Sequence, residues 1–221
     1  MIANRTDDSA ELAILGDIGD EFSGGVSDRM FHDELKSLGD VRNINITLNS
    51  GGGLAFSGVS IMNMLKSHPA YVTVEVVGLA ASAASIIAMG ADTVIMRKAA
   101  MMMVHLPFGL VIGNAEDMRK QANILDQLTN ELVGIYKAKT GKRDHTILKL
   151  LQDETWMNGQ QAVEMGFADK VIDTPGERAN IEPGRYLHCP PEVLEAAAAE
   201  KPKLSDPWRS RAARRAESLQ F

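Results

Sequence analysis

The stretch Val72-Thr-Val-Glu-Val-Val-Gly-Leu-Ala-Ala-Ser-Ala-Ala-Ser-Ile-Ile-Ala-Met-Gly90 decides how this chain folds. Val72 to Val77 alternates β-branched side chains, as a buried strand does. We expect Gly78 to break the strand, and Ser82 to Met89 has the small, apolar composition of a buried helix. Ser82 is thus predicted at the amino end of a helix, where unpaired N–H groups and the helix dipole favour negative charge. A serine placed there is either a helix cap or a nucleophile beside an oxyanion hole.

Strands and helices alternate outward from this stretch. The patterns predict strands at 11–18, 43–48, 92–96 and 166–172, an apolar run ended by proline at 101–107, and helices at 27–38, 54–65, 114–139, 144–152 and 158–165. Ser27 is the expected N-cap of the first helix, and Gly141 the expected C-cap after the longest one. This alternation predicts an α/β domain with a largely parallel sheet.

Composition excludes several classes of protein. The net charge of −6 gives no reason to expect nucleic acid as a partner, and no apolar run approaches the ~20 residues of a membrane span. The first residues lack the basic and apolar regions of a signal peptide. The single cysteine, Cys189, permits no internal disulfide and fits a reducing compartment. We therefore expect a soluble, cytoplasmic protein.

The character of the chain changes near residue 173. Six of the eight prolines lie between 175 and 207, where the apolar periodicity also weakens. We predict a domain over 1–172 and an appendage over 173–221, with possible helices at 191–200 and 205–219.

Two further features lie where ligands bind in α/β folds. Asn49-Ser-Gly-Gly-Gly53 follows a strand and opens a helix, so it is expected at the carboxyl edge of the sheet. Its glycines allow backbone N–H groups to approach a substrate oxygen closely, although a plain turn has the same composition. His105 ends an apolar run at the same edge, although a lone histidine there is more often structural. No histidine pair has metal-ligand spacing, so we expect no metal site.

A serine nucleophile needs a base to accept its proton and a carboxylate to orient that base. Asp153 and Glu154 are the downstream candidates for the carboxylate. A solvated, acidic end of a helix would explain both residues equally well.

Four stretches together resemble the ordered motifs of the Clp protease proteolytic subunit (ClpP) family. They are Asn49-Ser-Gly-Gly-Gly53, Gly78-Leu-Ala-Ala-Ser82, Met103-Val-His-Leu-Pro107 and Gln161-Ala-Val-Glu-Met-Gly-Phe-Ala-Asp169. Gly16-Asp-Ile-Gly19, Gly113-Asn-Ala-Glu-Asp-Met118 and Glu154-Thr-Trp156 resemble the branch of ClpP-like proteases that tailed phages and prophages use for head maturation. The resemblance covers about Glu11 to Val171.

The resemblance implies a ββα superhelix shared with crotonases, with 114–139 as the long "handle" helix. It implies Ser82 as nucleophile, His105 as general base, and an oxyanion hole formed by N–H groups of Gly52, Gly53 and Ala83. Counting back from Gly166 and Asp169 places Glu154 at the position of the triad acid, with Asp153 as the rival. Gly51 replaces the family's usual proline, which should loosen the glycine loop. No cofactor is implied.

The expected function is that of a serine endopeptidase acting on capsid or scaffold proteins, in the host cytoplasm if the chain is phage-encoded. One alternative is a degradative peptidase fed by a separate ATP-dependent (AAA+) unfoldase. Another is a crotonase-like acyl-CoA enzyme or an inactive assembly protein on the same fold. A Ser–Lys dyad with Lys98 is a further variant. The resemblance also implies a homo-oligomeric ring, either a heptamer or a double ring.

Overall fold

The computed structural model describes residues 4–5, 8–19, 25–177, 179–182 and 184–198, and the predicted helix at 205–219 lies outside them. The strands are β1 (Asn4–Arg5), β2 (Ser9–Leu15), β3 (Asn43–Ser50), β4 (Tyr71–Ala81), β5 (Thr93–Lys98), β6 (Met101–Val104), β7 (Thr155–Asn158) and β8 (Lys170–Pro175). The helices are α1 (Asp28–Ser37), α2 (Ala55–Ser67), α3 (Ala83–Ala88), α4 (Ala115–Thr140), α5 (Asp144–Gln152), α6 (Gly159–Glu164) and α7 (Pro191–Ala198).

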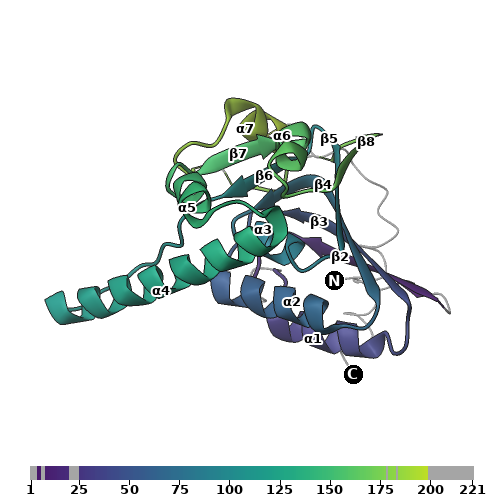
Figure 1. Cartoon of the computed structure of the whole chain (residues 1–221), viewed down its shortest axis with the longest axis horizontal. Helices are drawn as coiled ribbons and strands as arrows, with labels where there is room; N and C mark the ends of the chain where they lie inside the picture. Colours follow the sequence, from purple (N-terminus) through teal and green to yellow (C-terminus); the bar gives the residue numbers. More distant parts are fainter. Residues whose placement is uncertain (1–3, 6–7, 20–24, 178, 183, 199–221) are drawn as a thin grey trace, which may run out of the picture.

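The sheet is mostly parallel, as the alternating pattern predicts. Its order is β1-β2-β3-β4-β5-β8, and only the pairs β1–β2 and β6–β7 are antiparallel. Strands β2 to β5 follow one another across the sheet, each joined to the next through one helix. Right-handed crossovers running in one direction place α1, α2 and α3 on the same face of the sheet (Figure 1).

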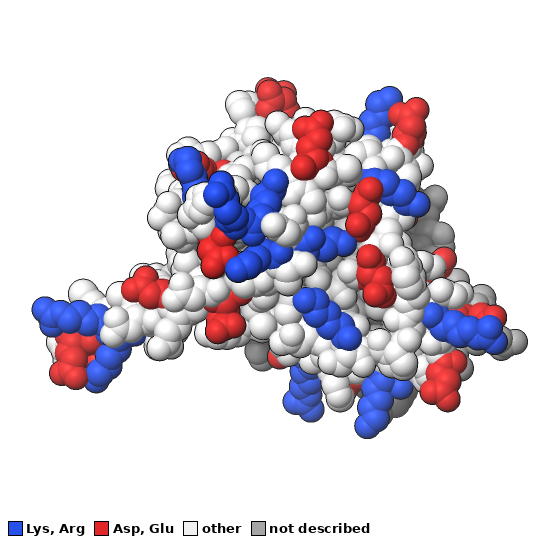
Figure 2. All heavy atoms as spheres, in the orientation of Figure 1, with Lys and Arg blue, Asp and Glu red and all other residues white. Residues whose placement is uncertain are grey.

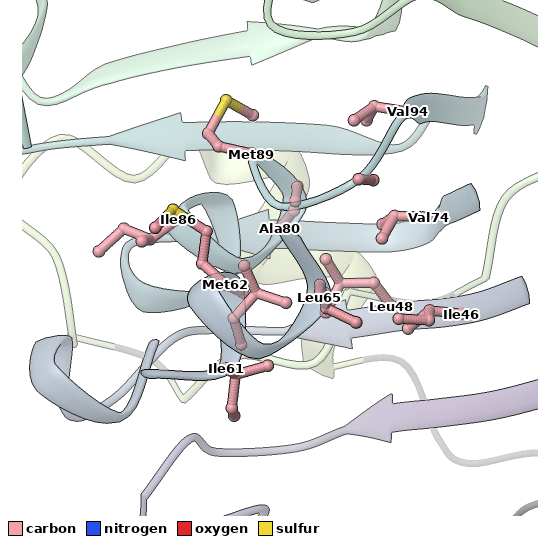
Figure 3. Packing of buried hydrophobic residues seen from close by; sticks show 14 of the residues in the cluster. Ile46, Leu48, Ile61, Met62, Leu65, Val74, Ala80, Ile86, Met89 and Val94 are labelled. Atoms are coloured by element: carbon pink, nitrogen blue, oxygen red, sulfur yellow. The ribbon is translucent and has the colours of Figure 1, made fainter. Parts of the chain in front are cut away.

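The main core lies between that face and these helices. Figure 3 shows side chains of β3 and β4, among them Leu48 and Val74, packed against Ile61 and Leu65 of α2. Ile86 of α3 lies in the same cluster and is 2% exposed. Burial of this kind contributes roughly 1.5–3 kcal/mol for each large apolar side chain.

The expected strand break at Gly78 is wrong. Strand β4 continues through Gly78 to Ala81 but changes its neighbour on one side at this point. It pairs with β5 as far as Val76 and with β6 from Leu79 onward. Glycine therefore marks a change of partner, since the end of a strand is set by its hydrogen bonds and not by one residue's propensity. Strand β7 was not predicted; it is four residues long and lies between the short helices α5 and α6.

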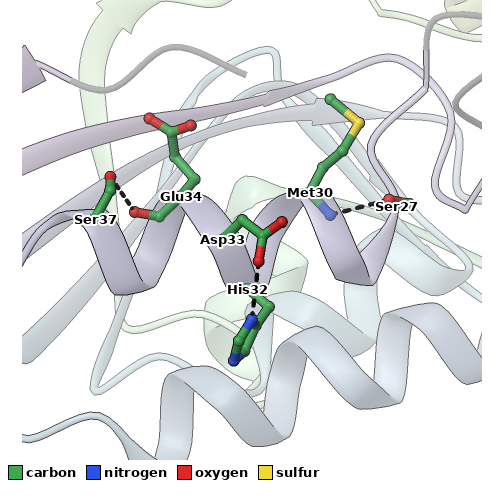
Figure 4. A network of polar contacts seen from close by, with 6 residues as sticks. All are labelled: Ser27, Met30, His32, Asp33, Glu34 and Ser37. Atoms are coloured by element: carbon green, nitrogen blue, oxygen red, sulfur yellow. Dashed lines mark hydrogen bonds and ion pairs between the residues drawn. The ribbon is translucent and has the colours of Figure 1, made fainter.

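Both predicted helix caps are confirmed. Ser27 Oγ accepts the N–H of Met30 at 3.0 Å, which fixes the start of α1 (Figure 4). Gly141 adopts a left-handed conformation with φ 68° at the end of α4. Such a conformation costs glycine little because it has no Cβ.

Helix α4 packs on the domain through its carboxyl-terminal half only, where Leu128, Leu132 and Tyr136 are buried. Its other half projects away from the sheet (Figure 1), and Met118 and Ile124 there are exposed. The projecting end carries both cationic and anionic side chains (Figure 2), including the ion pair Lys120–Glu116 at 2.9 Å. Among the described residues, no helix is both long and apolar enough to cross a bilayer.

The described residues after β8 return to the sheet. They form a second apolar cluster on the face of β4 opposite Ala80. This cluster joins Ile181, Tyr186 and Val193 to Leu79, Ala81 and Met103 of β4 and β6. Successive strand residues point to opposite faces, so the carboxyl end of β4 is covered on both sides. A domain boundary near residue 173 stays a prediction.

Candidate active site

Ser82 occupies the tight turn between β4 and α3. Its backbone has φ 53° and ψ −122°, a conformation that non-glycine residues avoid. Strain of this kind costs of order 1–3 kcal/mol and concentrates at functional sites. The Ser82 side chain makes no capping hydrogen bond to α3. The helix-cap explanation of this serine therefore does not hold, and the half-buried Ser82 instead lines a pocket.

His105 lies beside that hydroxyl because of the strand register. Ala81 pairs with Met103, and the Ser82 N–H donates to Met103 O at 3.0 Å. The next residues along both strands therefore emerge together, and His105 Nε2 lies 2.8 Å from Ser82 Oγ. This distance suits transfer of the serine proton to the imidazole.

The glycine loop, residues 51–53, reaches the same edge. Ser50 pairs with Ala80, which brings the loop against the turn at Ser82. A Cβ on Gly52 would lie 2.7 Å from Ser82 Cβ and 3.1 Å from Ala83 N, so only glycine permits this approach. Gly52 also has φ 93°, which favours glycine for a second reason.

The three predicted oxyanion donors differ in what they bind. The Gly52 N–H donates to Ser50 Oγ at 3.0 Å. The N–H groups of Gly53 and Ala83 donate to no acceptor in the described part of the chain. Ala83 is also the first residue of α3, where N–H groups have no partner within the helix. Two donors near Ser82 thus remain available to a developing oxyanion.

The two candidate acids are clearly separated. Strands β6 and β7 are antiparallel with Val104 opposite Thr155, so the register places Glu154 across from His105. Asp153 instead pairs with Lys149 at 2.8 Å on α5, where both side chains are exposed. Of these two carboxylates, only Glu154 acts on the pKa of His105.

Glu154 does not hydrogen-bond to His105. Its carboxylate accepts the N–H groups of Leu187 at 3.2 Å and His188 at 2.7 Å, and a weaker bond from Trp156 Nε1 at 3.4 Å. His105 Nδ1 has no hydrogen-bond partner within the described ranges. Glu154 therefore influences the imidazole through its charge.

Burial lowers the pKa of His105 below its ordinary value of 6.5. The Glu154 carboxylate raises this pKa and the Arg185 guanidinium lowers it, and the net direction is downward. His105 is consequently neutral at pH 7, the form in which it accepts a proton.

Sequence reasoning missed the contribution of residues 184–188. The hydroxyl of Tyr186 donates to Gly51 O, and its ring lies edge-on to His105 with centroids 5.2 Å apart. Arg185 pairs with Asp17 and lines a pocket of about 350 Å³ together with Ser82 and His105. No periodicity or motif marks these residues, and their position follows only from the tertiary path of the chain.

Comparisons with known proteins agree on one family. The model of the family described as Clp protease matches residues 1–175. An ATP-dependent Clp protease proteolytic subunit 1 from Protochlamydia amoebophila is 33% identical over 173 residues, which cover 76% of this chain and 82% of the relative. The protein of the same name from Salinibacter ruber is 29% identical over 171 residues, covering 76% and 71%.

Among solved structures, a mutant of ClpP1 from Listeria monocytogenes superposes with a TM-score of 0.66. The match covers 74% of this chain and 91% of that one at 22% identity. This likeness confirms the predicted α/β fold with its mostly parallel sheet.

The strain at Ser82 leads to a stability prediction. The free energy of unfolding should be about 1 kcal/mol higher for Ser82→Gly than for Ser82→Ala, so the glycine variant should be the more stable of the two. Glycine adopts positive φ without a Cβ clash. Chemical denaturation measures this difference. At Ser85, inside α3, the order should reverse, because glycine is a poor helix residue. Equal free energies of unfolding for the two Ser82 variants would show that the Ser82 backbone is not strained.

Proposed function

The chain belongs to the Clp protease family of serine peptidases, and on that premise we propose that Ser82, His105 and Glu154 hydrolyse peptide bonds through an acyl-enzyme. The observation that carries the proposal is the strained turn that holds Ser82 Oγ 2.8 Å from His105 Nε2 without using the serine as a cap. The match to the family model includes all three residues.

In the proposed reaction, Ser82 Oγ attacks the substrate carbonyl while its proton passes to His105 Nε2. The N–H groups of Gly53 and Ala83 stabilise the tetrahedral oxyanion. The intermediate collapses when His105 returns the proton to the leaving amine, and water then hydrolyses the acyl-enzyme by the same route. The Glu154 charge stabilises the imidazolium formed in each step.

The substrate is proposed to enter beside the Ser82–His105 pair. The pocket there also includes Gly53, Phe108 and Arg185. Phe108 is 71% exposed and lies 5.7 Å from the His105 ring, measured between centroids. An exposed aromatic residue at the rim provides apolar surface for a substrate side chain.

The first prediction of this proposal concerns the nucleophile. A fluorophosphonate probe should label the wild-type chain at Ser82, and Ser82→Ala should abolish both labelling and peptide cleavage. Mass spectrometry of the labelled peptide locates the probe. Ser85→Ala is the matched control, because Ser85 has a similar Ala-Ala-Ser context but a fully buried hydroxyl bonded to Tyr136 at 2.8 Å. Full cleavage by Ser82→Ala would exclude the proposal.

The second prediction separates the two acids. The acid limb of the kcat/KM profile should have its midpoint below pH 6.5, because burial keeps His105 neutral to lower pH. Glu154→Gln removes the charge that raises the pKa of His105, so the midpoint should fall further and turnover should drop about tenfold or more. Asp153→Asn should change neither quantity, since that carboxylate pairs with Lys149. The reverse pattern would assign the role to Asp153.

We also propose that the chain processes capsid or scaffold proteins during phage or prophage head maturation, as a homo-oligomeric ring. The support for this setting is the resemblance of residues 16–19, 113–118 and 154–156 to that branch of the family. The exposed apolar residues Met118 and Ile124 on α4 support a ring, because such side chains are commonly covered by a second copy.

A degradative role is the second candidate, and the two bacterial relatives named as subunits of ATP-dependent Clp proteases favour it. If the maturation role is right, the purified chain should cleave, without ATP, a capsid or scaffold protein encoded by the same phage or prophage genome. Degradation of a folded protein only with ATP and a separate AAA+ unfoldase would identify the second role. SDS gels of both reactions, with Ser82→Ala as the blank, distinguish them.

A further inference from the structure

The segment after β8 crosses the active-site edge of the sheet. We call its described residues 179–182 and 184–189 the C-terminal strap. The strap is tied to β3 where the Asn180 N–H donates to Asn49 Oδ1 at 3.1 Å, and to Glu154 through the N–H groups of Leu187 and His188. Its apolar side chains pack on β4 and β6. The strap is thus built into the wall of the candidate site.

Tyr186 is the strap residue with the most direct link to the glycine loop. It is 9% exposed, and its hydroxyl donates to Gly51 O. The peptide bond that carries this oxygen also carries the Gly52 N–H, which donates to Ser50 Oγ at 3.0 Å. One peptide unit is therefore held at both ends, by the strap on its carbonyl side and by β3 on its N–H side.

This restraint matters because the loop is intrinsically loose. Three consecutive glycines have no Cβ, and glycine populates positive and negative φ about equally. Gly52 has φ 93° and Gly53 has φ 151°. A rotation of the Gly51–Gly52 peptide would move Gly52 away from Ser82 and carry the Gly53 N–H with it. Oxyanion donors accelerate a reaction only when they are held in place before charge develops.

We propose that Tyr186 is a positioning residue, which fixes the glycine loop beside Ser82 through its hydrogen bond to Gly51 O. The inference rests on the proposed serine peptidase function. It assigns a catalytic consequence to the strap, a part of the chain beyond residues 1–175 that match the family model.

A purely structural role for Tyr186 makes a different prediction. Its ring packs edge-on to His105 and to Trp156, with centroid distances of 5.2 and 5.9 Å. Phenylalanine keeps those ring contacts and removes only the hydroxyl. Burial raises the pKa of Tyr186, although the Arg185 charge and a hydrogen bond with Ser82 oppose the rise. The hydroxyl therefore stays protonated and able to donate over the working pH range.

The test compares Tyr186→Phe with the wild-type chain in hydrolysis of a short fluorogenic peptide. We expect kcat to fall about three- to tenfold, the usual range for one lost hydrogen bond, while KM changes by less than about twofold. Tyr71→Phe is the matched control. It removes a hydroxyl bonded to Thr93 Oγ1 at 2.6 Å at the opposite end of β4, and kcat should not change.

A double-mutant cycle identifies the route of the effect. Ser50→Ala removes the hydrogen bond at the other end of the same peptide unit and should also lower kcat. If Tyr186 acts through that peptide, the double variant should lose less activity than the product of the two single losses. If Tyr186 acts on Ser82 directly, the losses should multiply, and the proposal would be overturned.

Other outcomes are equally decisive. Unchanged kcat in Tyr186→Phe would overturn the proposal and leave the ring contacts as the role of this residue. A rise in kcat would overturn it as well, because the strap would then restrain the loop in an inactive form. Absence of turnover and of probe labelling in the wild-type chain would instead refute the proposed function, so the two failures are distinguishable. Thermal unfolding of each variant checks that the fold is kept.

Discussion

The change of partner along β4 is the constraint on which the candidate site depends. Strand β4 pairs with β5 as far as Val76 and with β6 from Leu79 onward. Strand β6 therefore runs beside the last residues of β4, and His105 emerges next to Ser82. The antiparallel pairing of β6 with β7 then brings Glu154 opposite His105. Two strand pairings thus bring together the proposed nucleophile, base and carboxylate, which come from three distant parts of the sequence.

The strain at Ser82 is sustained by the packing around it. Residues Val76 to Ala81 of β4 are buried on both faces, and every residue of α3 is buried as well. A turn between two such elements has little freedom to relax, since its neighbours fill the space on each side. Gly52 lies directly against the turn and could not carry a side chain. The surrounding core therefore holds the serine in a conformation that its own backbone disfavours.

Local patterns were enough to predict most of the fold and part of the site's geometry. The strand–turn–helix pattern at Ser82, the three glycines and the end of an apolar run at His105 are short-range signals, and the structure brings these residues together. The choice between Asp153 and Glu154 was not predictable locally, because the two residues are adjacent and both acidic. Only the fold separates them, since Asp153 pairs with Lys149 of α5 while Glu154 lies across from His105. Tyr186 and Arg185 were missed because a proline-rich segment without periodicity gives no indication of where it returns.

The strap adds an electrostatic constraint to the geometric one. Burial lowers the pKa of His105, the Glu154 carboxylate raises it, and the Arg185 guanidinium lowers it further. The same segment supplies Arg185 and the two N–H groups that hold Glu154. Any movement of the strap would therefore alter both charges acting on the base at once. Since Asp17 pairs with Arg185, the position of that cation also depends on the loop after β2. Burial and three segments that meet only in the folded chain therefore act together on the pKa of His105.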